Sequence, residues 1–233
     1  MLAKPEISFF IPCLNEAYNI IGTLETVLTS ANNIPHEIIV IDDGSTDETF
    51  NIVENFRQQN KIYTLQNIRN EKNRGLGSSY SHAIKLAHGQ YFMMIPGDNV
   101  KSVEHIRSVI DRRGKADIII PYFADLDNRT RKRKIISKCF TLLVNIISGN
   151  HIPYYNGAVL HKLENLKNLP FVLEGFGYQA EILCYILAKN ITYLTIKVPL
   201  NERSGQSSAF RFKNIIAILN SLISIASRRY RNY

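Results

Sequence analysis

The chain has 233 residues, 45% of them hydrophobic, and its 28 lysines and arginines against 20 aspartates and glutamates give a formal net charge of +8. This length allows one substantial α/β core and argues against two full-sized independent domains. The basic balance predicts an anionic partner, and nucleic acid, nucleotide phosphates and an anionic membrane surface all meet that condition. The cysteines Cys13, Cys139 and Cys184 form no CxxC pair, which argues against a zinc or dithiol site and is typical of a reducing cytoplasm.

Short β-branched runs alternate with helical patterns in the first half of the chain, as they do in βαβ units with a mostly parallel sheet. The patterns predict strands at 7–11, 37–41, 62–65, 91–95 and 117–121. The helices expected between them are 17–30, 46–58, 78–88 and 103–112. This order predicts a nucleotide-binding α/β domain.

The character of the chain changes after Tyr122. Arginine and lysine dominate 128–138, and the apolar run 140–147 follows, which predicts a basic turn leading into an apolar helix at a membrane surface. The later elements are expected to be a helix at 178–189, a strand at 191–198, a polar loop at 201–208 and an apolar basic-ended helix at 215–226. This last stretch is shorter than the about 20 helical residues that a membrane span needs, so we expect no span. The run 7–11 is also too short for the core of a signal peptide.

Two carboxylates end the predicted second strand. The stretch 38–47 reads IIVIDDGSTD, and ligands of open α/β sheets bind beyond the carboxyl ends of the strands. Asp42 and Asp43 therefore lie where the base or ribose of a nucleotide could be hydrogen-bonded. The alternative is an ordinary strand-to-helix turn in which Ser45 or Asp47 caps the helix.

Further polar residues are predicted on the same rim. The first strand runs into IPCLNEAYNI, which brings Pro12, Asn15 and Glu16 to its carboxyl end. The segment NRGLGSSY, with Arg74 and Gly75, is a basic loop that opens a helix and suits close approach to phosphate or sugar. The chain lacks the GxGxxG dinucleotide fingerprint, which argues against a dehydrogenase.

The expected fourth strand, YFMMI, is followed by Pro96, Gly97, Asp98 and Asn99. A carboxylate at this strand end, beside the other rim acids, is suited to Mg²⁺ or Mn²⁺ shared with a diphosphate, because these ions prefer oxygen ligands. The alternative is a plain β-turn, for which PGDN is a favourable composition.

An ordered series of motifs carries a resemblance to a known family. IPCLNE, IIVIDDGSTDET, NRGLGSSY, YFMMIPGDN, RKRKIISK, NGAVLHK, GYQAE and ERSGQSSAFRF together resemble family 2 glycosyltransferases of the GT-A fold, in particular the dolichol- or polyprenyl-phosphate mannose and glucose synthases. The likeness covers about residues 7–219. It implies a mostly parallel central sheet flanked by helices and an enzyme that uses a nucleotide sugar.

The resemblance also implies roles for individual residues. It assigns Pro12, Glu16 and Asp43 to the nucleotide, with Asp43 as the partner of the base, and Gln179 to the donor site. From their place on the same rim we expect Asn15, Asp42, Arg74 and Gly75 to complete the nucleotide-sugar site. Asp98 is the implied ligand of a divalent cation, Mg²⁺ or Mn²⁺. The family usually has an Asp-Ala-Asp type motif here, so Pro96 and Gly97 replace the first acid and the small residue, and one metal ligand is missing.

The second half of the chain carries the implied acceptor and catalytic groups. Arg133 and Ser137 match an acceptor-phosphate site, lie four residues apart on one helix face, and could equally form a solvated basic face. Gln179 and Glu181 match a donor-site QxE motif, and Arg203 falls where the family has a mobile, positively charged residue that approaches the phosphates. Glu174 and Glu181 are candidate proton acceptors if the sugar acceptor is a hydroxyl.

The expected protein is thus an inverting glycosyltransferase that moves a hexose from a GDP- or UDP-sugar to a polyprenyl-phosphate type lipid. We expect it at the cytoplasmic face of a membrane, on the surface or docked to an integral-membrane partner. Its catalytic domain would span 1–208, with a nucleotide-binding half to about 122 and an acceptor-binding half from 123, before a basic amphipathic helix at 209–233. The alternatives are a same-fold transferase acting on a glycan hydroxyl and a non-enzymatic module that binds nucleic acid or membrane, although no nucleic-acid motif is present.

Overall fold

The computed structural model describes residues 4–123, 131–173, 177–198, 220–227 and 229, and for 131–133 it describes the backbone alone. The described chain forms one seven-stranded sheet with the strand order β3-β2-β1-β4-β6-β5-β7. The strands are β1 (Ile7–Cys13), β2 (His36–Asp42), β3 (Leu65–Arg69), β4 (Tyr91–Met94), β5 (Ile118–Phe123), β6 (Leu160–Lys162) and β7 (Tyr193–Val198). The helices are α1 (Ile20–Ser30), α2 (Thr49–Gln59), α3 (Leu76–Leu86), α4 (Val103–Ile110), α5 (Arg131–Ser148), α6 (Glu164–Lys167) and α7 (Tyr178–Leu187).

The sheet is mostly parallel, which confirms the predicted fold class. The pairs β1–β2, β1–β4, β2–β3 and β5–β7 are parallel, whereas β6 runs antiparallel to both β4 and β5. No strand was predicted at β6, because three residues are too few to show an alternating pattern.

Two predicted boundaries are wrong for local reasons. The strand expected at 62–65 begins only at Leu65, since Lys61 has a φ of 52° and Leu65 N–H donates to the Ile62 carbonyl in a turn. The first helix begins at Ile20 rather than Ala17, because the Glu16 carbonyl accepts turn hydrogen bonds from the N–H groups of Asn19 and Ile20.

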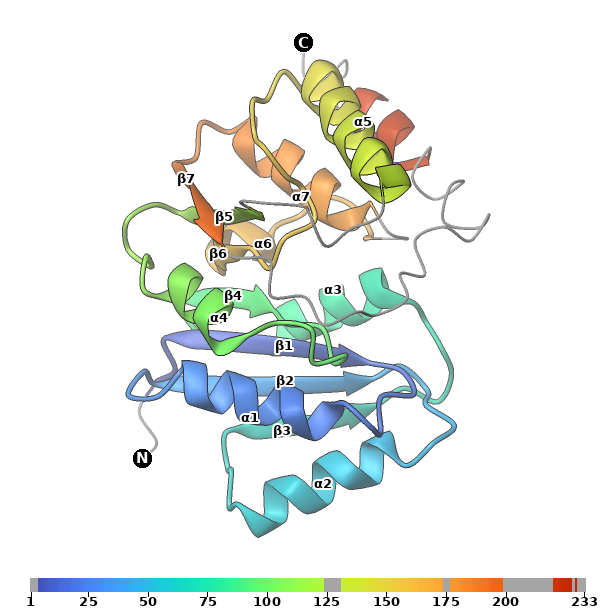
Figure 1. Ribbon diagram of the computed structural model, residues 1–233, viewed down its shortest axis with the longest axis vertical. Coiled ribbons are helices and arrows are strands. Elements are labelled where there is room, and N and C mark those ends of the chain that lie inside the picture. Colours follow the sequence, from blue (N-terminus) through green and yellow to red (C-terminus); the bar gives the residue numbers. More distant parts are fainter. Residues whose placement is uncertain (1–3, 124–130, 174–176, 199–219, 228, 230–233) are drawn as a thin grey trace.

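Alternate residues of the strands supply two apolar cores, one on each face of the sheet. Ile7, Phe9 and Ile11 of β1 pack in the cluster that receives α1 and α4, and Phe10 packs in the cluster that receives α3 and α7. Figure 1 shows α1 and α4 lying on the same face of the strands. With both faces covered, ligands have access to this sheet at the ends of its strands.

The basic segment belongs to α5 rather than to a turn before it. Helix α5 starts at Arg131 and continues through the apolar run to Ser148, so the expected basic turn is the helix's own first turns. A carboxyl-terminal helix at 220–227 lies beside α5, and Arg229 Nη1 donates to the Ile147 carbonyl over 2.6 Å (Figure 1). Among the residues that the structure describes, no helix combines the length and apolar character that crossing a bilayer requires.

Candidate active site

The predicted rim forms where the carboxyl ends of β1, β2 and β4 meet. Cys13 of β1 is in register with Asp42 of β2, and Asp43 N–H donates to the Cys13 carbonyl over 2.9 Å. From the end of β4, Gly97 N–H donates to the Pro12 carbonyl over 3.1 Å. Three motifs that are far apart in sequence therefore share one edge of the sheet.

Asp43 ties the second strand to the NRG loop. Its side chain is 7% exposed and accepts hydrogen bonds from Asn70 Nδ2 at 2.7 Å, Arg74 N at 3.0 Å and Gly75 N at 2.8 Å, with Ser79 Oγ at 3.4 Å. Gly75 has a φ of 84° and is the N-cap of α3, a conformation that glycine adopts at little cost. The carboxylate therefore fixes the loop that opens α3, as well as lying at the position implied for the base.

Asp42 is fully buried one residue earlier and is less well satisfied. Its Oδ1 accepts from Ser45 N at 2.8 Å, whereas Oδ2 has no hydrogen-bond partner and lies 3.7 Å from Arg69 Nε. Arg69 is in register with Asp42 on β3 and also donates to the Ser45 carbonyl. The buried charge of Asp42 is thus compensated by a cation on the neighbouring strand.

The loop after β1 is tied to the loop after β2. Asn15 has a φ of 57°; its N–H donates to Ser45 Oγ and its Oδ1 accepts from Thr46 N at 2.8 Å. The next backbone N–H, that of Glu16, donates to Thr49 Oγ1 over 2.9 Å. These bonds hold both loops in one arrangement before any ligand binds.

Asp98, in the loop after β4, is close enough to Glu16, in the loop after β1, to act on its charge. Burial raises the pKa of the Glu16 carboxyl, the hydrogen bond from Asn19 opposes this, and the negative charges of Asp98 and Asp47 raise it further. Gly97 is closely packed, because a Cβ there would lie 3.0 Å from the Pro12 carbonyl oxygen and 3.1 Å from Cys13 Cβ. The packing therefore favours a small residue before Asp98, and Asp98 acts on a second carboxylate that does not come from its own motif.

Helix α7, from the other half of the chain, contacts the end of β4 and the strand β6 beside it. Tyr178 donates from its hydroxyl to Met94 at the end of β4, and its ring packs on Tyr80 of α3 at 5.0 Å between centroids. The next residue, Gln179, is buried, and its Nε2 lies 3.1 Å from Nε2 of His161 on β6. Burial lowers the pKa of His161 to about 3, so the ring is neutral and one of its nitrogens can accept from the Gln179 amide.

Glu181 faces the carboxyl-terminal helix. It is 6% exposed, and Oε2 accepts a hydrogen bond from Ser224 Oγ at 3.1 Å. Ser137 is half-buried on α5, where Arg133 is placed by its backbone alone. Arg203 and Glu174 lie outside the described residues.

Two site residues were not singled out from the sequence. Arg69 could have been found from its position at the end of β3, where a parallel neighbour sets it opposite Asp42. His161 lies within the NGAVLHK motif, but its contact with Gln179 depends on strand β6, which was not predicted.

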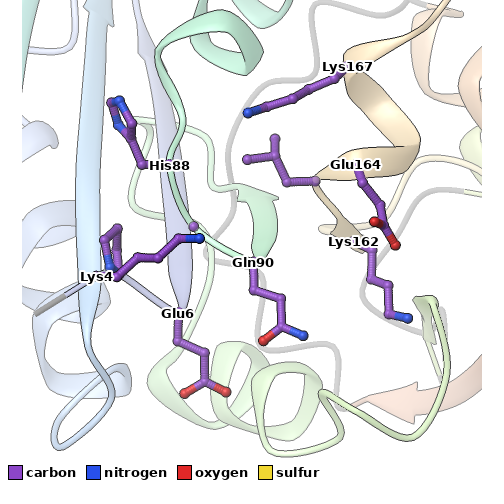
Figure 2. A pocket seen from close by; sticks show the side chains of 10 residues that line it. Lys4, Glu6, His88, Gln90, Lys162, Glu164 and Lys167 are labelled. Carbon is purple, nitrogen blue, oxygen red and sulfur yellow. The ribbon is translucent and has the colours of Figure 1, made fainter.

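A separate cavity of about 510 Å³ lies at the opposite edge of the sheet. Figure 2 shows Lys4 and Lys167 on opposite walls, with His88 and Gln90 at the start of β4. Lys162 in this cavity is paired with Asp117 at 2.6 Å. None of the predicted site residues that the structure describes lines the cavity, so the candidate active site is the rim and not this cavity.

Known proteins share both the fold and the sequence pattern. The crystal structure of glucosyl-3-phosphoglycerate synthase from Mycobacterium tuberculosis, in complex with Mn²⁺, UDP and phosphoglyceric acid, superposes with a TM-score of 0.71 at 15% identity, covering 96% of this chain and 79% of that one. At this identity the likeness shows the GT-A fold alone.

Two curated relatives match at the level of sequence. An uncharacterized glycosyltransferase of Rickettsia typhi is 28% identical over 63% of this chain, which spans only 49% of that relative's length. The dolichyl-phosphate β-glucosyltransferase of Dictyostelium discoideum is 23% identical over 95% of this chain and 74% of its own. The sequence model of Glycosyl transferase family 2 matches residues 8–161, more than half of the chain. The rim of strand ends described above lies within that match, and the chain belongs to glycosyl transferase family 2.

Proposed function

We propose that the protein transfers a hexose, with inversion, from a UDP- or GDP-linked donor to a polyprenyl-phosphate type lipid at the cytoplasmic face of a membrane. The observation that carries the choice of acceptor is the likeness to a dolichyl-phosphate β-glucosyltransferase over 95% of the chain. It is supported by Glu181, one of the two candidate proton acceptors, being buried and hydrogen-bonded to Ser224. A hydroxyl acceptor needs a carboxylate that can take its proton, whereas a lipid phosphate is already ionised.

The donor site in this proposal is the rim of strand ends. Its groups are Pro12, Asn15, Glu16, Asp42, Asp43, Arg74, Gly75 and Gln179. Because the loops are already held by hydrogen bonds around Asp43 and Asn15, little ordering cost remains when the nucleotide binds. Arg203 would offset the charge that grows on the departing diphosphate, and Arg133 with Ser137 would hold the acceptor phosphate.

The residues at the end of β4 fit a divalent cation shared with the substrate. Within the described residues, no three His, Cys, Asp or Glu side chains come close enough together to hold a metal ion by themselves. Mg²⁺ typically takes only one or two carboxylates and completes its shell with substrate phosphates and water, so Asp98, with Glu16 nearby, suffices. When bound there, the ion would supply positive charge beside the diphosphate leaving group.

The proposal is tested by supplying the purified chain with radiolabelled UDP- and GDP-sugars and polyprenyl phosphate, with and without Mn²⁺. We expect label in the lipid only with a divalent ion, and a loss of about 100-fold or more in Asp98→Asn. Asp111→Asn, an exposed carboxylate at the end of α4, is the matched control and should retain turnover.

Two results would contradict the proposal. Label that enters a glycan hydroxyl but not polyprenyl phosphate would make the protein a same-fold transferase with another acceptor. Equal turnover of Asp98→Asn and Asp111→Asn, with unchanged thermal unfolding, would remove Asp98 from the metal site.

A further inference from the structure

The outer face of α5 is apolar and exposed. Leu142 is 60% exposed and Ile146 65%, and the face comprises Ile135, Ile136, Cys139, Leu142, Leu143 and Ile146. Positions 135, 139, 142 and 146 recur at helical spacing and therefore form one line along the helix. We call these six residues the α5 outer face. Contiguous apolar surface of this kind marks an interaction site rather than an ordinary protein surface.

The exposure of this face does not come from a loosely held helix. On the inner side Val144 is fully buried, and Asn145 accepts the Tyr155 hydroxyl at 2.7 Å while its Nδ2 donates to the Ile152 carbonyl at 3.0 Å. At the carboxyl end, Arg229 donates to the Ile147 carbonyl, which would otherwise lack an intrahelical partner. The helix is therefore fixed on the protein with its apolar side turned outward.

The charge on α5 indicates what covers this face. The helix begins with RKRK, continues to Lys138, which is exposed, and contains no acidic residue from 131 to 148. An apolar stripe on a helix with a basic end is the pattern of helices that lie in the interface of an anionic bilayer. A protein partner would explain the apolar stripe, but it would not by itself explain why every charged residue of the helix is lysine or arginine.

We propose that the α5 outer face inserts into the headgroup layer of an anionic membrane and is the surface by which the protein docks there. The choice of a bilayer over a protein partner rests partly on the proposed lipid-phosphate acceptor. Docking in this way gives the enzyme access to a lipid without a membrane-spanning helix.

The same geometry orients the proposed acceptor site. At about 100° per residue, positions 133 and 137 lie about half a turn away from the line of Ile135, Leu142 and Ile146. Ser137 is half-buried, which agrees with a protein-facing position. A docked α5 would thus separate the bilayer from the Arg133–Ser137 row, and the acceptor phosphate would reach that row by passing the basic end of the helix.

Vesicle binding in the absence of nucleotide sugar tests the docking surface. We would compare sedimentation with vesicles of phosphatidylcholine and phosphatidylglycerol for the wild type and for Leu142→Ser/Ile146→Ser. The double variant should bind about ten-fold more weakly or worse, because it removes two of the most exposed apolar side chains. Tyr63→Ser, which alters a 75% exposed side chain next to β3 at the far edge of the sheet, should bind as the wild type does.

A charge variant separates headgroup attraction from apolar insertion. Lys134→Gln/Lys138→Gln should lower binding to the anionic vesicles several-fold and leave the weaker binding to pure phosphatidylcholine vesicles unchanged. Wild-type affinity in the apolar double variant would overturn the proposal. A wild type that is dimeric in solution, with a monomeric double variant, would also overturn it, since a second copy would then cover the face.

Activity keeps this inference distinct from the proposed function. With a short-chain, water-soluble prenyl phosphate, Leu142→Ser/Ile146→Ser should turn over at the wild-type rate. Failure of the wild type to use that acceptor, combined with α5-dependent vesicle binding, would remove the proposed function and leave the docking surface standing.

Discussion

The two halves of the molecule differ in how their functional surfaces are held and exposed. In the part built from β1 to β4, the polar groups of the rim are bonded to one another, and Asp43 alone accepts from Asn70, Arg74 and Gly75. In the part built from β5 to β7 and α5, a fixed helix presents Leu142 and Ile146 to the outside. The rim of the first half is tied together by its own hydrogen bonds, whereas the second half keeps an exposed apolar face that we propose a membrane covers.

This difference indicates that the two halves would bind their ligands in different ways, the nucleotide in the first and the lipid in the second. A nucleotide diphosphate is small, charged and bound by a few groups, so preorganised loops reduce the entropy lost on binding. A lipid is bound at a surface, so the chain can leave its apolar area exposed until docking. The predictions below test whether the halves differ in this way, beginning with the largest expected effect.

The first prediction concerns the bonding around Asp43. In Asp43→Asn an amide NH₂ must face at least one of the N–H or NH₂ donors, because Oδ1 and Oδ2 both accept from nitrogen. We expect a loss of about 3 kcal/mol in the free energy of unfolding, together with weaker nucleotide binding. Urea unfolding and calorimetric titration with UDP and GDP measure these two quantities.

Asp42→Asn is the matched control for this change. Its amide oxygen can keep the bond from Ser45 N, and the NH₂ then occupies the place of Oδ2, which has no hydrogen-bond partner. The expected loss is about 1–2 kcal/mol, from the lost attraction to Arg69 and from a buried NH₂ group that has no acceptor. Equal losses in the two variants would mean that Asp43 contributes as a buried charge and not through its hydrogen bonds.

The second prediction concerns pH and compares one histidine from each half. Burial lowers the pKa of His161 on β6 to about 3, and burial followed by the charge of Lys101 lowers the pKa of His105 on α4 to about 3. Below pH 6.5 the unfolded chain binds these protons and the folded chain does not, so stability falls as the pH falls from 6.5 towards 3. Between pH 7 and 5 the loss is at most about 2 kcal/mol per histidine.

The measurement is the slope of unfolding free energy against pH in His105→Phe, His161→Gln and the double variant. Each single variant should flatten the slope between pH 7 and 5, and the double variant should flatten it further. Carboxylates with lowered pKa values, such as Glu54, lose their contribution below this window. A slope that survives in the double variant would place the acid sensitivity elsewhere.

Much of the first half was predictable from the sequence. The strands around Phe9 and Val40 are buried on both faces of the sheet, and their apolar runs are visible in the sequence. The polar residues that follow these strands must therefore meet at the carboxyl edge of a parallel sheet. The structure places the strand ends at Pro12, Asp42 and Gly97 side by side, as that rule requires. The catalytic roles of the rim residues stay predictions.

The second half was less predictable because its structure depends on contacts distant in sequence. Strand β6 is three residues long and is defined by its antiparallel pairing with β4 and β5, so no local sequence pattern predicts it. The bond between Glu181 and Ser224 joins positions 43 residues apart and depends on the packing of the carboxyl-terminal helix. Neither periodicity nor turn chemistry contains this information.

The third prediction concerns the contacts that hold α5 on the rest of the protein. Tyr155→Phe removes a buried hydroxyl that donates to Asn145 Oδ1, but Asn145 Oδ1 still accepts from Ile152 N at 3.3 Å. We therefore expect a loss of only about 1 kcal/mol in unfolding free energy. Faster hydrogen exchange in α5, with unchanged exchange in β1 and β2, would accompany it. Tyr63→Phe removes a hydroxyl from an exposed ring and should change neither quantity.

Nucleotide affinity in Tyr155→Phe then tests the independence of the two halves. Within the described residues, the hydrogen bonds of Asp43 and those of Tyr155 share no residue, whereas Tyr155 and Tyr80 of α3 pack in the same apolar cluster. Unchanged UDP and GDP affinity, alongside a loosened α5, is what independence predicts. If UDP and GDP affinity instead falls as hydrogen exchange in α5 becomes faster, the packing of α5 is coupled to the donor site. The two halves would then not be independent.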